Sequence, residues 1–267
     1  MDLPLHGSSV TSDTPFSIWL NEAVTVLIED DYLAFLFGAD YIRPQNSIQL
    51  YTPETSTFSL DTGVTTMPIQ PEDFNDPNDL VTYTKAPEFV RMIQTILGRH
   101  AFAWALDLYH RRFFDHNASP HDWLEIMGDI GKTDFSIMAG RWLRRTGYPT
   151  VTPAAAYNPG KDLAEITVEQ TGFEGQDPWI FPLTGTLITD KGTVVTEFVK
   201  KIDDPRTKLS PSPVNGTFAA AIWNHGHAAP MSESPAPHPT MNSTSSSNVT
   251  PISSAASSPT RLSSTAK

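Results

Sequence analysis

The sequence predicts a mainly α-helical region, then a small β unit, then a disordered tail. Up to about residue 149, apolar residues recur at steps of three and four, the period of helices packed on a core. After Pro149, β-branched residues gather in short strand-like runs. Beyond Asp204 the chain is rich in Ser, Thr, Pro and Ala, with too little apolar material to offset the entropy of folding. We therefore divide it into residues 1–149, 150–204 and 205–267.

The composition is that of an acidic, soluble protein. Eighteen Lys and Arg against thirty Asp and Glu give a net charge of -12, which repels phosphate backbones and anionic lipid, so neither nucleic acid nor a membrane is an expected partner. The absence of cysteine excludes disulfides and thiolate metal ligands. The sequence has neither a signal peptide nor an apolar run that could span a bilayer. We expect a cytoplasmic protein, or one whose true N-terminus is missing.

The first expected element is a helix that begins after Thr14 and ends at Gly38. Thr14 is a suitable N-cap, Pro15 suits the first turn, and glycine commonly stops a helix. Apolar residues cover more than one face of this helix, so we expect it to be largely buried. Glu22 lies in its first turns, and a buried carboxylate requires a cation, a cage of hydrogen bonds or a metal ion. Glu22 is therefore a candidate site residue.

The next stretch, from Asp40 to about Asn78, is expected to be a long irregular connection. Pro, Asn, Asp, Ser and Thr interrupt its short β-prone pieces. Helical periodicity resumes at Pro87 and continues to Phe114, and Gly98 divides this region into a helical hairpin.

Two further helices complete the first region, the first capped by Ser119 and the second by Thr133 or Asp134. The period then changes, and strands are expected in the β-branched runs. These runs are 163–169, 179–189 and 193–202, with Asp190, Lys191 and Gly192 as a hairpin turn.

Two segments resemble a known enzyme family. Residues Trp19–Thr25 (WLNEAVT) resemble the helix that supplies the glutamate zinc ligand in the aminopeptidase N family of zinc metallopeptidases. Residues Tyr83–Ile93 (YTKAPEFVRMI) resemble the segment in which the catalytic tyrosine of that family opens a helix. Glu22 and Tyr83 are 61 residues apart, which agrees with the family's spacing. The resemblance extends over about residues 7 to 202.

The resemblance implies a zinc aminopeptidase, whose substrates are peptides with a free N-terminus. It implies Glu22 as a zinc ligand and Tyr83 as the donor that stabilises the negative charge developing on the substrate carbonyl oxygen. Glu29, two helical turns after Glu22, would orient a metal-bound histidine from outside the ligand shell. Residues 1–149 would form the C-terminal helical part of a thermolysin-like catalytic domain, and residues 150–204 a β-sandwich-like unit.

The family's other two zinc ligands and its general base come from a His-Glu-x-x-His helix. The second His of that motif precedes the ligand glutamate by nineteen residues, which corresponds to Leu3, and the motif is absent from this sequence. We interpret the chain as an internal piece of such an enzyme, lacking its N-terminal part. One carboxylate holds zinc only weakly, so the chain alone is expected to be inactive. The alternative is a non-catalytic remnant that acts at most as a binding or scaffold module.

The histidines are not expected to form a site of their own. His110, His116 and His121 have spacings that match no ligand pattern on a single helix face, and we interpret them as surface residues. His225 and His227 fall in the predicted disordered tail. The sequence also contains no phosphate-binding glycine loop and no Gly-x-Ser-x-Gly motif.

Overall fold

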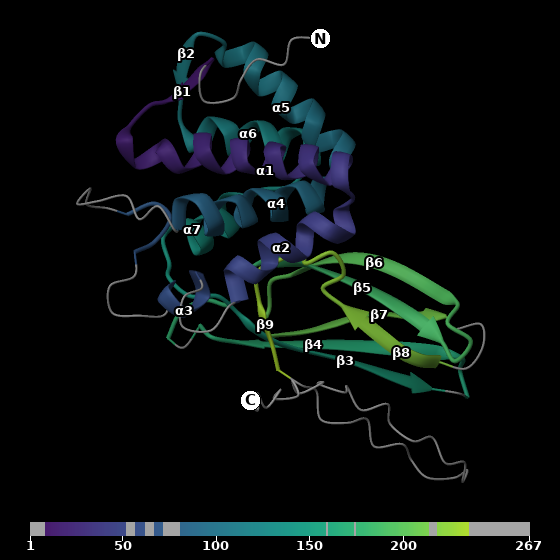
Figure 1. Ribbon diagram of the computed structural model, residues 1–267. Helices are drawn as coiled ribbons and strands as arrows, with labels where there is room; N and C mark the ends of the chain where they lie inside the picture. The colour runs from purple at the N-terminus through teal and green to yellow at the C-terminus, as the bar shows by residue number, and fades with distance from the viewer. Residues whose placement is uncertain are drawn as a thin grey trace, which may run out of the picture. The chain divides into compact units, whose positions relative to one another are not determined.

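The computed structural model describes residues 9–51, 57–61, 67–71, 81–158, 160–173, 175–213 and 218–234 (Figure 1). The chain divides into two units, Met1–Ala236 and Pro237–Lys267, and the second lies outside the described residues. The disorder predicted for residues 237–267 therefore stays a prediction. In the first unit, buried apolar side chains from helices and strands form one hydrophobic cluster.

Helices make up the first half of the described chain. Helix α1 contacts both α2 and α4, and α5 contacts α6 (Figure 1). No described helix is long and apolar enough to cross a lipid bilayer. In chain order the helical elements are the 3₁₀ turn η1 (Pro15–Ser17), α1 (Ile18–Phe37), α2 (Ala39–Tyr51), α3 (Thr57–Asp61), the π-helical turn η2 (Val81–Lys85), α4 (Ala86–Leu97), α5 (Arg99–Phe113), α6 (Pro120–Gly131) and α7 (Ser136–Leu143).

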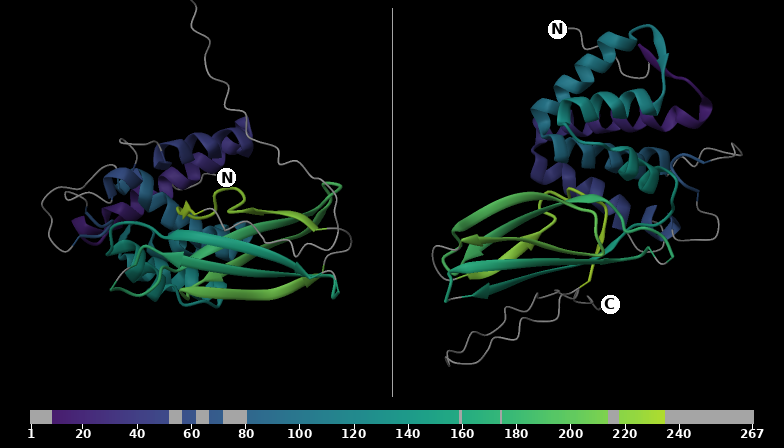
Figure 2. Two further views of the ribbon diagram at one scale, coloured as in Figure 1. Left: turned by 90° about the horizontal axis from the view of Figure 1, so that it is seen from below. Right: turned by 180° about the vertical axis from the view of Figure 1, so that it is seen from behind.

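The strands of the two larger sheets begin with β3 at Thr150, as the change of period predicts. They form a four-stranded sheet in the order β7-β4-β3-β9 and a three-stranded sheet in the order β6-β5-β8, seen from two further sides in Figure 2. A small parallel pair, β1 and β2, lies among the helices. The strands are β1 (Val10–Ser12), β2 (His116–Ala118), β3 (Thr150–Asn158), β4 (Leu163–Thr171), β5 (Phe181–Thr189), β6 (Val194–Ile202), β7 (Arg206–Pro213), β8 (Phe218–Trp223) and β9 (Ser232–Glu233).

The predicted helix ends at Gly38 and Gly98 and the predicted start at Ser119 are confirmed, whereas the helix expected to be capped by Thr133 or Asp134 begins at Ser136 with Phe135 as its N-cap. Gly38 ends α1 with a φ of 95°, and Gly98 separates α4 from α5 with a φ of 79°. Both values are ones that glycine adopts without strain. At the start of α6, Ser119 and Asp122 form a reciprocal capping box.

The first helix is buried only over its first half. Leu20 and Val24 are almost wholly buried, but Tyr32 is 60% and Phe35 is 83% exposed. The prediction of a largely buried helix is therefore wrong for the second half of α1. The apolar residues of this helix lie on all of its faces. The sequence pattern alone therefore does not show which face is covered by other elements.

The prediction of an irregular connection after Asp40 is wrong for α2 and α3. Helix α2 buries Arg43, Ser47 and Leu50, which follow one another at steps of four and three, and it packs on α1. It tolerates Pro44 inside the helix. Packing on a neighbouring helix thus outweighs the turn-forming composition of this stretch. Residues 52–56, 62–66 and 72–80 of the predicted connection lie outside the described residues.

The prediction that the chain is disordered from residue 205 is also wrong, because β7, β8 and β9 follow that position. Strand β7 pairs with β4, and β8 pairs with β5, so each gains its backbone hydrogen bonds from a strand already in a sheet. Ala229 and Met231 join the hydrophobic core, and Trp223 packs against it. The disorder prediction used the composition of the whole region after Asp204, and this average does not reveal a few apolar residues near its start.

Candidate functional site

Glu22 lies in the first turns of α1 and is only partly buried, whereas Asn21 and Ala23 beside it are buried. The described residues provide no hydrogen bond or ion pair to its carboxylate. The described residues therefore do not supply Glu22 with the cation or the cage of hydrogen bonds that a buried carboxylate would require. The carboxylate remains available to a ligand or to another polypeptide segment.

Tyr83 lies at the centre of η2, and its side chain is 45% exposed. The residues around it are anchored more deeply, since Thr82 is 7% and Lys85 is 0% exposed. The turn continues directly into α4. Single π-helical turns are rare and are frequently found at functional sites.

The two elements that carry Glu22 and Tyr83 are neighbours. Helix α1 contacts both η2 and α4. The rings of Trp19 on α1 and Phe89 on α4 meet edge to face, with their centroids 6.0 Å apart. The fold therefore brings together two segments that lie far apart in the sequence.

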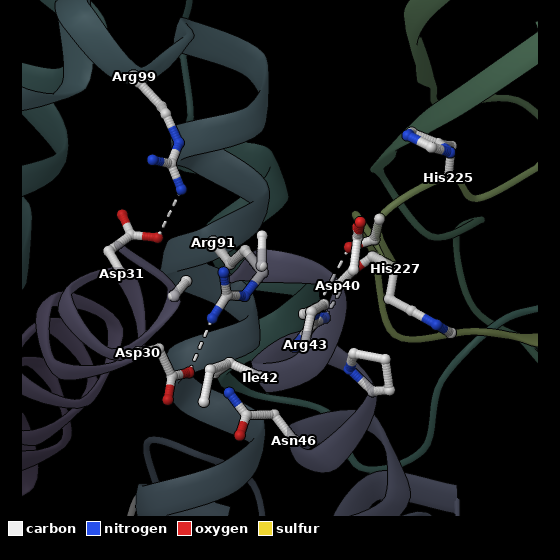
Figure 3. A pocket seen from close by; sticks show the side chains of 14 residues that line it. Asp30, Asp31, Asp40, Ile42, Arg43, Asn46, Arg91, Arg99, His225 and His227 are labelled. Atoms are coloured by element: carbon white, nitrogen blue, oxygen red, sulfur yellow. Dashed lines mark hydrogen bonds and ion pairs between the residues drawn. The ribbon is translucent and has the colours of Figure 1, made fainter. Parts of the chain in front are cut away.

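Glu29 is exposed on α1, and no described residue donates a hydrogen bond to it or forms an ion pair with it. The acids that follow it are paired instead. Asp30 binds Arg91 at 2.8 Å and Asp31 binds Arg99 at 2.9 Å (Figure 3). Burial raises the pKa of Asp30, and the charge of Arg91 offsets part of this effect.

Arg43 and Glu88 form a buried ion pair that sequence reasoning missed. Each of the two guanidinium Nη atoms of Arg43 donates to one carboxylate oxygen of Glu88 at 2.6 Å. The same guanidinium donates to the carbonyl oxygens of Gly226 and His227, at 3.3 and 2.5 Å. Burial disfavours the charged guanidinium, but the carboxylate of Glu88 more than offsets this and raises the pKa of Arg43.

A cavity of about 390 Å³ lies beside this ion pair. Helices α1, α2, α4 and α5 line it together with the segment that follows β8, and Figure 3 shows its side chains. Its three arginines, Arg43, Arg91 and Arg99, are each paired with a carboxylate. His225 and His227 also line it, which corrects their predicted place in a disordered tail.

Lys85 and Asp61 form a second buried ion pair, with Nζ 2.5 Å from Oδ2 and both side chains fully buried. Lys85 also donates to the carbonyl oxygen of Gly147 at 3.0 Å, and the amide of Gly147 donates to Asp61 at 2.7 Å. Burial lowers the pKa of the Lys85 ammonium, and the carboxylate of Asp61 offsets part of that effect.

The remaining histidines do not gather. His116 and His121 are exposed, as predicted, but His110 is 9% exposed and its Nδ1 lies 2.8 Å from the carbonyl oxygen of Leu106. The prediction that His110 is a surface residue is therefore wrong, because this helix face packs inward. Nowhere in the described chain do three or more His, Asp or Glu residues lie together as a metal ion would require.

The family model "Peptidase family M1 domain" matches residues 5–142. Aminopeptidase N of Escherichia coli is 29% identical over 167 residues, which are 61% of this chain and 19% of the relative. Aminopeptidase M1 of Arabidopsis thaliana is 28% identical over 187 residues, which are 67% and 20% of the two chains. The chain thus spans about a fifth of the length of these relatives.

The fold is similar to that in a crystal structure of Legionella pneumophila aminopeptidase A in complex with aspartic acid. The TM-score is 0.70, at 16% sequence identity. The alignment covers 86% of this chain and 25% of the other. At this identity the likeness shows a shared fold, with helices and sheets in a similar arrangement.

Proposed function

The chain belongs to peptidase family M1, and we propose that it is the part of a zinc aminopeptidase that supplies one metal ligand and the tyrosine that stabilises the transition state. The observation that carries this proposal is the family match over residues 5–142, which includes both Glu22 and Tyr83. The contact between α1 and η2 supports it. The chain spans about a fifth of the length of its relatives. We therefore assign the activity to a longer enzyme in which such a segment would form one part.

Glu22 is proposed as the anionic ligand of the zinc ion. Its carboxylate is partly buried, and the described residues leave it unpaired, which supports this role. A hydrolytic zinc site takes three protein ligands, and the described residues contain no cluster of that size. These residues therefore do not fit zinc by themselves, and the other ligands must come from a segment that carries His-Glu-x-x-His.

Tyr83 is proposed as the donor to the substrate carbonyl. Its hydroxyl would donate a hydrogen bond to the carbonyl oxygen, where negative charge develops as the peptide bond is attacked. A single donor of this kind typically contributes about 2.7–4 kcal/mol to transition-state stabilisation. Its 45% exposure supports the role, since a donor to substrate must be reachable.

Glu29 is proposed to orient a metal-bound histidine from outside the ligand shell. It lies two helical turns after Glu22, and no described residue engages its carboxylate. Such supporting carboxylates typically change metal affinity or activity by about 10–100-fold when they are removed.

The proposed domain organisation follows from the family. Residues 1–149 would be the C-terminal helical part of a thermolysin-like catalytic domain, and a β-sandwich-like unit would follow from residue 150. The two larger sheets support the second assignment, although strands β7 to β9 extend this unit beyond residue 204. Peptides with a free N-terminus are the proposed substrates, and the cytoplasm is the proposed location.

The second candidate function is that of a non-catalytic binding module. The absence of a three-ligand cluster from the described residues favours it. A chimeric enzyme separates the two candidates. Residues 9–234, which contain most of the 167-residue match, would replace the corresponding part of Escherichia coli aminopeptidase N, and the remaining residues of that enzyme stay in place.

If the proposal is right, the chimera binds zinc and hydrolyses an amino-acid anilide, whereas the full chain alone does neither with zinc added. A chimera that folds but neither binds zinc nor turns over the anilide would favour the non-catalytic candidate. Turnover by the isolated chain would contradict the proposed need for further ligands.

A further inference from the structure

We propose that helix α3 is a brace that fixes the position of Tyr83, through the buried pair Asp61–Lys85 and the hydroxyl pair Thr57–Thr84. Its relevance to catalysis rests on the proposed function of Tyr83, whereas the brace itself is a property of the fold. The four bracing residues are positioning residues, since they would act through Tyr83.

Both contacts are made by the two residues that directly follow Tyr83. The hydroxyl groups of Thr84 and Thr57 share a hydrogen bond of 2.6 Å, and Nζ of Lys85 lies 2.5 Å from Oδ2 of Asp61. Thr57 and Asp61 are the first and last residues of the five-residue helix α3. Residues four apart lie on the same face of a helix, so one face of α3 holds two consecutive residues of the turn.

The ion pair also joins a third segment. Lys85 and Asp61 both bind the backbone of Gly147, which lies between α7 and β3. A buried ammonium group is costly unless its N–H donors all find acceptors. Lys85 therefore donates both to the carboxylate of Asp61 and to the carbonyl oxygen of Gly147. The turn η2 is thereby held against two other parts of the chain.

Burial alone does not fix the side chain of Tyr83. Its side chain is 45% exposed, and it lies in a π-helical turn whose five residues adopt an uncommon geometry. A donor to a transition state must be held within about 0.5 Å of its productive position, usually by surrounding hydrogen bonds. Apolar residues of similar size often stabilise a fold as well as a buried ion pair does, so the role assigned to this pair in the brace is to specify geometry.

The test measures Tyr83 directly in the full chain. The protein is labelled with 3-fluorotyrosine, and the signal of Tyr83 among the seven tyrosines is assigned with Tyr83→Phe. Lys85→Met combined with Asp61→Leu replaces the ion pair by apolar groups, and Thr57→Val removes one hydroxyl group without removing a charge. Thr57→Ser keeps the hydroxyl and serves as the conservative variant. Asp107→Asn, which breaks an exposed ion pair with Arg111, is the matched control.

We expect the fluorine signal of Tyr83 to shift and broaden in the apolar double variant and in Thr57→Val, while the signal of the core residue Tyr109 is unchanged. Thr57→Ser and Asp107→Asn should leave the Tyr83 signal as it is. An unchanged Tyr83 signal in a folded Thr57→Val and a folded double variant would overturn the proposal. If the double variant does not fold, Thr57→Val alone decides.

The fluorine result is independent of the catalytic role. In the chimeric enzyme, Tyr83→Phe tests that role by turnover alone. A shifted Tyr83 signal together with full turnover of Tyr83→Phe would support the brace and reject the proposed function of the tyrosine. An unshifted Tyr83 signal in the brace variants, together with lost turnover of Tyr83→Phe, would reject the brace and support the proposed function of the tyrosine.

Discussion

Arg43 and Glu88 are joined by two parallel hydrogen bonds of 2.6 Å, and the two residues are only 9% and 3% exposed. The remaining donors of Arg43 reach the carbonyl oxygens of Gly226 and His227. One side chain therefore connects α2, α4 and the segment between β8 and β9. A bidentate guanidinium contact of this kind is specific in geometry as well as strong.

Glu88→Gln should lower the free energy of unfolding by about 3–5 kcal/mol, because it leaves the buried guanidinium of Arg43 without its carboxylate. Urea unfolding of the full chain measures this. Asp107→Asn is the control, since its exposed pair with Arg111 contributes less than about 1 kcal/mol. Equal effects of the two substitutions would show that the Arg43–Glu88 pair is not a structural link.

Ser119→Ala should destabilise the chain by about 1 kcal/mol at neutral pH, the usual effect of losing an N-cap. Hydrogen bonds from Ser119 lower the pKa of Asp122 below its ordinary value of 3.8. Because the folded-state pKa is lowered, this stabilisation is complete above the unfolded-state pKa and is lost as the pH falls through the folded-state pKa. The stability difference between wild type and Ser119→Ala should therefore shrink in strong acid to the part that comes from the Asp122 amide donating to Ser119. A difference that is the same at every pH would show that Asp122 takes no part.

Removal of all residues after Asp204 should abolish the cooperative unfolding transition. It deletes β7 and β8, which pair with β4 and β5, and it deletes the carbonyl groups that Arg43 binds. A chain that ends at Ala236 keeps the whole first unit and should unfold cooperatively. Thermal denaturation followed by circular dichroism distinguishes the two. Identical transitions would mean that the last strands contribute little to the fold.

Tyr83→Phe in the chimeric enzyme should lower kcat by about 10²–10³-fold while zinc content is unchanged, because one donor to the developing oxyanion is lost. Steady-state hydrolysis of an amino-acid anilide, with zinc measured on the same samples, provides the test. Tyr109→Phe is a control in the core, 1% exposed. Wild-type turnover in Tyr83→Phe would remove this residue from the mechanism.

The sequence predicts the elements that local signals define. Gly38 and Gly98 mark helix ends, and Ser119 followed by Pro120 marks a helix start, because each acts through its own backbone conformation or through a cap three residues away. The roles of Glu22 and Tyr83 come instead from the resemblance of two short segments to a known family, and they stay predictions.

The remaining features depend on contacts between distant segments. Helix α2 contains turn-forming residues and is helical because it packs on α1. The pair Arg43–Glu88 joins residues 45 positions apart, and Arg43 reaches His227 across 184 positions. No local pattern specifies such partners, so neither ion pair nor the strands after residue 205 could be predicted from the sequence.

The zinc content of the chimeric enzyme and its Glu22→Gln variant tests the central proposal most directly. Gln keeps the size of the side chain but removes the anionic ligand, and Glu29→Gln serves as the comparison on the same helix. We predict about one zinc ion per chimera, little or none in Glu22→Gln, and a smaller loss in Glu29→Gln, in line with the 10–100-fold effect typical of a residue that supports a ligand. Full zinc occupancy in a folded Glu22→Gln chimera would contradict the assignment of Glu22 as a metal ligand.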